Sequence, residues 1–221
     1  MRTRRLTAEF IGSAFLVAGV IGSGIMAERL SPDDVGLQLL ENALATAGVL
    51  YVIILMFAPV SGAHFNPAVT LADCLVGGRP WRDLAPYVTA QIAGGCFGAV
   101  VANLMFDLTA VEISTKSRSG SNLWLAEMVA TFGLVLVIFA LVRTSRAHLV
   151  AGAVAAYIGA AYFFTSSTSF ANPMVSVART LSDTFAGIEP ASVPMFIVMQ
   201  LIGAVLAAGM AAWLWPEPTE N

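Results

Sequence analysis

The gaps between charged residues are the feature that most limits how this chain can fold. Charged residues make up 11% of the 221 residues, and apolar residues make up 57%. A helix needs about 20 mostly apolar residues to cross a bilayer. The pattern therefore predicts an all-α membrane protein, and it argues against a disordered chain and against a soluble globule. The stretches without Lys, Arg, Asp or Glu are residues 10–27, 42–72, 84–106, 128–142, 147–178 and 190–216.

Two of these stretches are too long for one span and too short for two. Residues 42–72 number 31, and residues 147–178 number 32. Each therefore predicts one full span plus about half of another. The other four stretches each fit one span, provided that the fourth span begins near Leu123 and includes Glu127. We predict six spans and two half-helices, and we interpret the first apolar run as a span and not as a cleaved leader.

Each overlong stretch is broken by polar, turn-forming residues that end in Asn-Pro. Residues 59–67 read PVSGAHFNP, and residues 165–173 read TSSTSFANP. Asparagine is a strong N-cap and proline suits the first helical position, so each pair predicts the start of a short helix. Irregular backbone at membrane depth is tolerated only where it is buried in protein or lines a watery cavity. The two breaks therefore indicate a pore or a binding cavity.

The two halves of the chain contain these motifs in the same order. Residues 6–12 correspond to residues 124–130, and the two Asn-Pro pairs correspond to each other. Three spans per half is an odd number, so the second half must enter the membrane inverted relative to the first. Inverted repeats bring discontinuous helices together near the bilayer midplane. We predict one domain over residues 1–221, with an inverted repeat of residues 1–110 and 120–221.

The distribution of charge predicts an orientation and few partners. The excess of arginine on one side predicts that both termini are cytoplasmic in a cell (inner) membrane. The net charge of −3 offers no basic field for nucleic acid. The two cysteines lack the spacing of a metal site or a disulfide framework, and we expect no cofactor, no metal and no catalytic residue. The arginines of the cytoplasmic side are Arg2, Arg4, Arg5, Arg79, Arg82, Arg143 and Arg146.

At this point the motifs resemble a known family. Residues 61–70, SGAHFNPAVT, resemble the first signature of the aquaporin and glycerol-facilitator channels, and Asn172-Pro173-Met174 resembles the second, with methionine in place of the usual alanine. The resemblance covers nearly the whole chain. It implies a six-span channel in the lipid bilayer, usually a homotetramer, that passively conducts water or small neutral solutes. The residues of the two pore boxes are then Asn66, Pro67, Ala68, Asn172, Pro173 and Met174.

The two half-helices would meet by their positive N-terminal ends, which oppose the entry of cations. Each boxed asparagine should cap its half-helix with the side-chain oxygen and leave its NH2 group free to donate into the pore. The breaks should offer backbone carbonyls to the solute. The resemblance also implies that a pair of glutamates braces the loops, and two glutamines are candidates for contacts between helices. The expected pore-lining residues are His64, Gly62, Ala63, Ser167 and Thr168, and the expected supporting residues are Glu9, Glu127, Gln91 and Gln200.

The outer constriction departs from the family pattern. The family usually has an aromatic residue there and an arginine three positions after the second asparagine, a place that holds Val175 here. The expected filter, carried over by spacing, is Thr46, Ala160, Ser169 and Val175. These side chains include no aromatic ring and no cation, so we predict a wide, arginine-free filter. Such a filter should pass water, glycerol and uncharged metalloid hydroxides such as arsenite.

Arg179 follows Val175 by four residues, one helical turn further out. One interpretation is that it restores a positive charge at the outer mouth. The other is an ion pair with Asp183, again one turn along.

Other functions fit part of the pattern. A water-selective aquaporin would share every motif. An ion-coupled secondary transporter also uses inverted repeats and broken helices, but it needs an ionisable residue near the midplane. An enzyme would need a catalytic constellation, and the sequence presents none. A structural junction protein would share the fold without conducting, so flux measurements must separate these alternatives.

Overall fold

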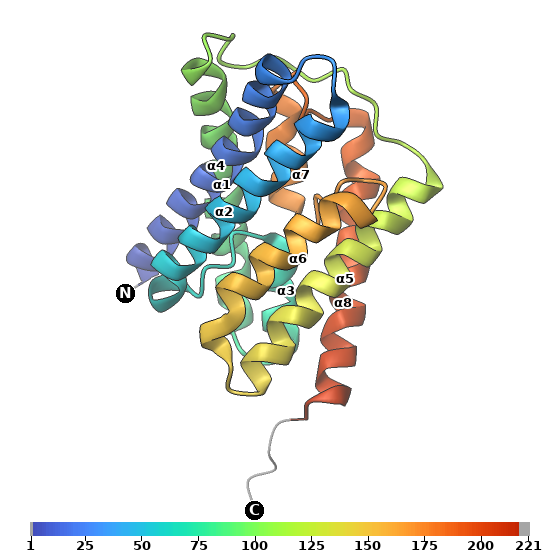
Figure 1. Cartoon of the computed structure of the whole chain (residues 1–221). Helices are drawn as coiled ribbons and strands as arrows, with labels where there is room; N and C mark the ends of the chain where they lie inside the picture. Colours follow the sequence, from blue (N-terminus) through green and yellow to red (C-terminus); the bar gives the residue numbers. More distant parts are fainter. Residues whose placement is uncertain (1, 217–221) are drawn as a thin grey trace, which may run out of the picture.

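The computed structural model describes residues 2–216, and this part of the chain contains helices and no strands (Figure 1). Six of the described helical segments are long and apolar enough to cross a membrane. The prediction of six spans and two half-helices is confirmed. The long helices are α1 (Arg2–Leu30), α2 (Val35–Ser61), α4 (Leu84–Met105), α5 (Ser121–Arg143), α6 (Val150–Phe164) and α8 (Val193–Leu214), and the two short ones are α3 (Pro67–Leu75) and α7 (Pro173–Ala178).

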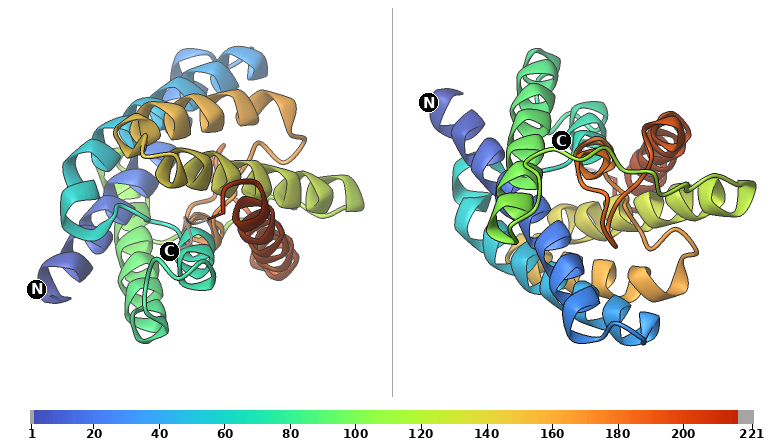
Figure 2. Two further views of the ribbon diagram at one scale, coloured as in Figure 1. Left: turned by 90° about the horizontal axis from the view of Figure 1, so that it is seen from below. Right: turned by 90° about the horizontal axis from the view of Figure 1, so that it is seen from above.

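The element order of the first half repeats in the second. Helix α1 packs against α2 and α4, as α5 packs against α6 and α8, and α2 meets α6 between the halves (Figure 2). The half-helices cross over: α3 contacts α8 of the second half, and α7 contacts α4 of the first. Each half therefore buries its half-helix partly against the last span of the other, which interlocks the two repeats at their centre.

Local sequence explains where α2 ends and α3 begins. Pro59 lies in the last turn of α2, and Gly62 follows as a C-cap with φ of 93°, a left-handed conformation that glycine adopts without steric cost. The Gly62 N–H donates to the carbonyl of Ala58 over 3.1 Å. Pro67 then occupies the first turn of α3, where the missing N–H would have had no helical partner.

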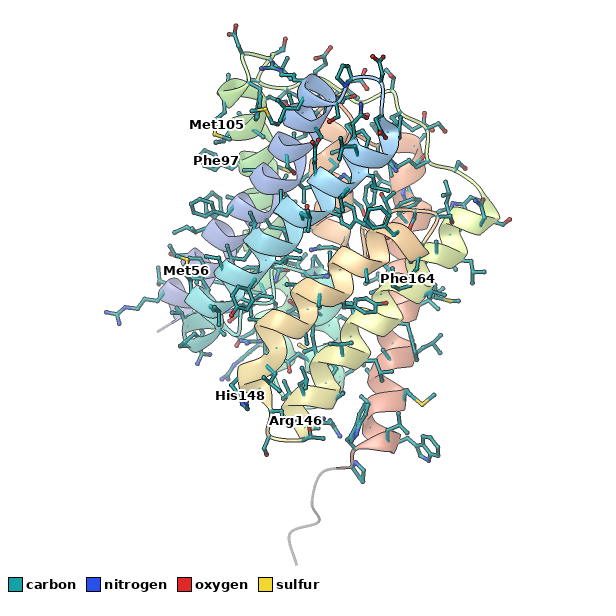
Figure 3. The ribbon with its side chains drawn as sticks, in the orientation of Figure 1. Met56, Phe97, Met105, Arg146, His148 and Phe164 are labelled. Carbon is teal, nitrogen blue, oxygen red and sulfur yellow. The ribbon has the colours of Figure 1, made fainter. Side chains whose placement is uncertain are left out.

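The outside of the bundle is apolar. Met56, Phe97, Met105 and Phe164 stand out from its sides, and each exposes more than half of its surface (Figure 3). Arg146 lies at the lower end of the same view, away from this apolar girdle. A soluble monomer rarely exposes so much contiguous apolar surface, whereas lipid tails cover it.

Small residues bring the spans into close contact. A Cβ atom on Gly94 would collide with the backbone of Phe10, and one on Gly98 would collide with the backbone of Ala14. These glycines of α4 therefore let α4 and α1 approach each other to backbone contact. Close approach of this kind is how helices associate in lipid, where burial against water contributes nothing.

Gly98→Ala should destabilise the bundle because the added methyl group forces α4 away from the backbone of α1. Overpacking of this kind typically costs about 1–3 kcal/mol. The matched control is Gly209→Ala, since a Cβ atom there meets nothing within 4 Å. We expect a lower thermal midpoint for detergent-solubilised Gly98→Ala and an unchanged or higher midpoint for Gly209→Ala. Equal midpoints in the two variants would contradict the close contact.

Candidate functional site

The boxed asparagines cap the two half-helices. Asn66 has extended backbone, and its Oδ1 accepts a hydrogen bond of 2.9 Å from the N–H of Ala68. Asn172 repeats this geometry, and its Oδ1 accepts a hydrogen bond of 3.0 Å from the N–H of Met174. The predicted N-caps are confirmed, and each satisfies a donor that the start of a helix otherwise leaves unpaired.

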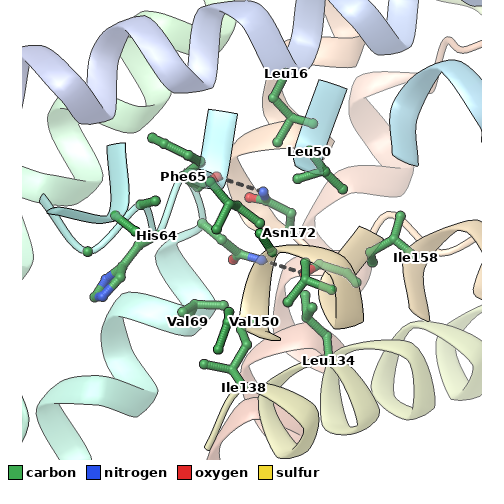
Figure 4. A pocket seen from close by; sticks show the side chains of 18 of the residues that line it. Leu16, Leu50, His64, Phe65, Val69, Leu134, Ile138, Val150, Ile158 and Asn172 are labelled. Atoms are coloured by element: carbon green, nitrogen blue, oxygen red, sulfur yellow. Dashed lines mark hydrogen bonds between the residues drawn. The ribbon is translucent and has the colours of Figure 1, made fainter. Parts of the chain in front are cut away.

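The side-chain amides also cross between the two halves. Nδ2 of Asn66 donates to the carbonyl of Ala171 over 2.8 Å, and Nδ2 of Asn172 donates to the carbonyl of Phe65 over 2.8 Å (Figure 4). The expectation that each NH2 group stays free to donate into the pore therefore applies to one of its two hydrogens, because the other joins the two halves. An amide nitrogen carries two hydrogens, so each asparagine keeps one donor that no described residue uses.

The first break is held by Glu9 of α1. Its Oε1 accepts hydrogen bonds from the hydroxyl of Ser61 and the N–H of His64, at 2.6 and 3.1 Å. Its Oε2 accepts from the N–H of Phe65 and from Nε2 of Gln91, both at 2.8 Å. A buried carboxylate costs several kcal/mol, and four donors at roughly 1.5–3 kcal/mol each offset that cost.

The second break repeats the arrangement around Glu127 of α5. The N–H groups of Phe170 and Ala171 each donate to its carboxylate over 2.9 Å. Nε2 of Gln200 donates to the same carboxylate and also to the hydroxyl of Ser176 on α7. Gln91 does the same in the first half, where its second contact is Thr70 of α3. Each glutamine therefore ties a span, a half-helix and a glutamate together.

The breaks themselves have unusual backbone. Ala63 and Phe65 have φ of 52° and 47°, and Ser169 and Ala171 have φ of 52° and 48°. These positions lie three and one residues before each asparagine, so the strain is symmetric. Left-handed conformations of non-glycine residues cost about 1–3 kcal/mol each, and they persist where surrounding contacts impose them.

Several carbonyls of the breaks lack intramolecular partners. Among the described residues, no donor reaches the carbonyl oxygens of Gly62, Ala63 or His64, nor those of Ser169 and Phe170. These five groups are therefore available to accept hydrogen bonds from a molecule in the adjoining space.

A cavity of about 570 Å³ joins the two breaks (Figure 4). Most of its wall is apolar, with Leu16, Leu50, Leu134, Ile138 and Ile158 among the wall residues. The breaks contribute polar groups to the same wall. The expected site residues that lie in the wall are Thr46, Gly62, Ala63, His64, Asn66, Ser169, Asn172 and Val175.

Other expected site residues lie elsewhere. Ala160 is exposed on the outside of α6, because the cavity-facing positions of that helix are spaced near the helical period and end with Ile158 and Tyr162. Ser167 and Thr168 are also absent from the wall, and Ser167 instead hydrogen-bonds the carboxylate of Glu127. The box residues Pro67, Ala68, Pro173 and Met174 are buried behind the asparagines, outside the wall.

The cavity wall around the expected filter residues also contains two larger side chains. Tyr162 lines the cavity, and its hydroxyl lies 3.1 Å from Oγ1 of Thr46. Arg179 lines it too, with its guanidinium 3.5 Å from the ring centroid of Phe170. The expected filter contains no aromatic ring and no cation, whereas the cavity wall that holds Thr46, Ser169 and Val175 also contains Tyr162 and Arg179.

The predicted ion pair between Arg179 and Asp183 is also wrong, and no such pair occurs within residues 2–216. Asp183 accepts a hydrogen bond of 2.9 Å from the backbone N–H of Thr115 and one of 3.2 Å from the hydroxyl of Ser114. The Thr115 hydrogen bond lowers the pKa of Asp183 below its ordinary value. Asp183 is therefore hydrogen-bonded to the loop that joins the two halves and not to Arg179.

The part of the wall beside the first break contains a second polar group, which the sequence did not indicate. Asp73 lies 3.4 Å from Nε of Arg79 and 3.4 Å from Nε2 of His64, and all three residues line the cavity. Nη2 of Arg79 donates to the carbonyl of Ser61 over 2.8 Å, which ties the group to the first break. Local sequence pattern does not predict this contact, because Asp73 and Arg79 lie on opposite sides of a turn that brings them together.

Comparisons with known proteins agree with this geometry. The profile of the major intrinsic protein family matches residues 1–170. The chain is 50% identical to the aquaglyceroporin AqpS of Rhizobium meliloti (strain 1021), over 96% of this chain and 90% of the relative. It is 31% identical to the aquaporin AqpM of Methanothermobacter thermautotrophicus, over 97% of this chain and 98% of the relative.

Among solved structures, the X-ray structure of the aquaglyceroporin from Plasmodium falciparum shares the fold, with a TM-score of 0.77, 20% identity and 95% coverage of both chains. The half-helices, their paired caps and the family match lead to one conclusion: the chain belongs to the major intrinsic protein family.

Proposed function

We propose that this protein passively conducts water, glycerol and uncharged metalloid hydroxides such as arsenite through the cavity between its half-helices. As a member of its family the protein is a channel for small neutral solutes and not an enzyme. The observation that carries the finer proposal is the shared wall: both asparagines line one cavity, and each keeps one unused N–H. The name of the relative AqpS, an aquaglyceroporin, supports glycerol as a solute.

The wall suits a hydroxylated neutral molecule. Such a solute can accept hydrogen bonds from the amides of Asn66 and Asn172 and donate to the unpaired carbonyls of the breaks. Its carbon side can lie on the apolar wall formed by residues such as Leu50 and Leu134. A small ion would lose its hydration on that apolar side without replacement, which is costly.

The size of the outer end also supports solutes larger than water. Val175 and Thr46 are short side chains, and both line the cavity where the family pattern places its constriction. We propose that Val175, Thr46, Ser169 and Tyr162 together set the width of the path there.

We further propose that both termini are cytoplasmic, in the cell (inner) membrane, and that the protein assembles as a homotetramer. The clustering of arginine supports this orientation, and two residues of that cluster lie together, since Arg2 donates to the carbonyl of Arg82. The apolar side chains exposed on the spans form a surface that neighbouring copies of the chain or lipid tails can cover.

Flux into proteoliposomes tests the proposed solutes. Stopped-flow light scattering should show water, glycerol and arsenite entering at least tenfold faster than into protein-free liposomes, with no dependence on pH or sodium gradients. Fast water flux with glycerol and arsenite excluded would favour the water-selective alternative, and flux driven by an ion gradient would favour a transporter. Absence of any flux would contradict the proposed channel and favour a structural junction protein.

Val175→Arg tests whether Val175 sets the width of the path. The larger side chain should slow glycerol and arsenite at least fivefold and slow water less, because it fills space that only the larger solutes need. Val175→Ala is the matched control and should preserve or raise glycerol flux. Unchanged glycerol flux in Val175→Arg would place the constriction elsewhere.

A further inference from the structure

A second pocket lies where α1 and α4 begin. Its volume is about 460 Å³, and none of the residues in its wall belongs to the wall of the cavity between the half-helices. The conduction path therefore does not explain why three arginines gather there. The residues of this pocket are Arg2 and Arg5 of α1, Arg82 and Asp83 of the turn before α4, and Tyr87 of α4.

The arginines of this pocket keep most of their hydrogen-bonding capacity. Nη2 of Arg2 donates to the carbonyl of Arg82 over 3.1 Å, which holds the two residues together. Within residues 2–216, the guanidinium groups of Arg5 and Arg82 contact no carboxylate and donate no hydrogen bond. The described wall contains one carboxylate, Asp83, and its Oδ1 lies 3.8 Å from Nη2 of Arg2, too far for a hydrogen bond. The wall therefore has an excess of positive charge and unused N–H donors.

These groups suit a phosphate group. The planar guanidinium fork matches the oxygens of a phosphate in two parallel hydrogen bonds. The positive end of the α1 dipole lies at the same place, because α1 begins at Arg2 and has no acidic residue in its first turn. Tyr87 keeps its part of the wall in place, since it is buried and its hydroxyl donates to the carbonyl of Ser61 over 3.0 Å.

The surroundings of the pocket place it at the level of lipid headgroups. Trp81, which precedes Arg82, exposes 56% of its surface, and tryptophan is typical of the boundary between water and the apolar layer. Further along the same two helices, the ring centroids of Phe10 on α1 and Phe97 on α4 lie 5.7 Å apart. Phe97 stands out from the side of the bundle (Figure 3). Helices α1 and α4 therefore offer guanidinium groups at their ends and an apolar surface beyond them.

We propose that this pocket binds the phosphate group of an anionic phospholipid. Basic pockets at the ends of membrane spans recognise such headgroups. A free phosphate has the same charge, but it has no acyl chains to cover the apolar surface of α1 and α4. The bound headgroup would join the two helices, because Arg5 belongs to α1 and Arg82 lies just before α4. Lipid binding should therefore stabilise the folded bundle, and this inference does not depend on which solute the channel passes.

The test follows the thermal midpoint of the full chain in a neutral detergent during titration with two lipids. Dioleoylphosphatidylglycerol and dioleoylphosphatidylcholine have the same acyl chains, but only the first has a net charge. The anionic lipid should raise the midpoint at a concentration about tenfold lower than the neutral lipid requires, because only it gains from the excess positive charge. Inorganic phosphate, added alone, should leave the midpoint unchanged.

Variants of the wall locate the site. Arg5→Gln and Arg82→Gln should each weaken binding of the anionic lipid about fivefold, since each removes one positive charge near the headgroup. Arg4→Gln is the matched control, because Arg4 is exposed on the same turn of α1 but is not part of the pocket wall, and its effect should stay below about twofold. Asp83→Asn removes the opposing charge and should strengthen binding about twofold, a gain that misfolding cannot produce.

Three results would overturn the inference. Equal affinity for the two lipids would show that charge plays no part. A loss in Arg4→Gln as large as that in Arg5→Gln would show attraction to the whole basic surface and not to this pocket. Stabilisation by inorganic phosphate that is lost in Arg5→Gln would assign the pocket to a free anion. Failure of the proposed solute flux with intact lipid binding would instead refute the proposed function alone.

Discussion

Two hydrogen bonds that cross the centre of the molecule hold its site together. Asn66 donates to the carbonyl of Ala171, and Asn172 donates to the carbonyl of Phe65. Each asparagine thus caps its own half-helix with oxygen and fastens the opposite break with nitrogen. Because both atoms of the amide are used, the two half-helices cannot separate without leaving buried polar groups unpaired, which is especially costly where no water or protein partner replaces them.

The cost of unpaired buried polar groups also explains the two buried glutamates. A break in a membrane span exposes backbone N–H groups that no helix satisfies, and Glu9 and Glu127 accept from them at two adjacent residues each. The carboxylates satisfy these N–H groups, the asparagines pair the carbonyls of Phe65 and Ala171, and the other carbonyls named above keep no partner among the described residues. Each break therefore offers backbone carbonyls as acceptors to the cavity, while its N–H groups are hydrogen-bonded to a buried glutamate inside the protein.

The sequence predicted what depends on local pattern. Span length, the Asn-Pro caps and the odd number of spans per half follow from residue spacing and capping chemistry, and the structure contains each of them. Prediction from the sequence failed for side chains whose position depends on the phase of a helix or on contacts with residues distant in the sequence. The count from Asn172 back to Ala160 passes through an irregular segment, so spacing alone does not set the face of α6 on which Ala160 lies. The setting of Arg179 depends on the loop between the halves, which takes Asp183 through Thr115 and leaves the arginine without its nearest acid.

The charged residues of the cavity wall are distributed unequally between its ends. At the inner end Arg79 lies 3.4 Å from Asp73, so the two charges largely cancel, and His64 adds a contact to the same carboxylate. The centre contains amides, which are polar but uncharged. At the outer end Arg179 has no such partner. The charge along the wall is therefore asymmetric, with a paired arginine near the first break and an arginine without an acidic partner near the second.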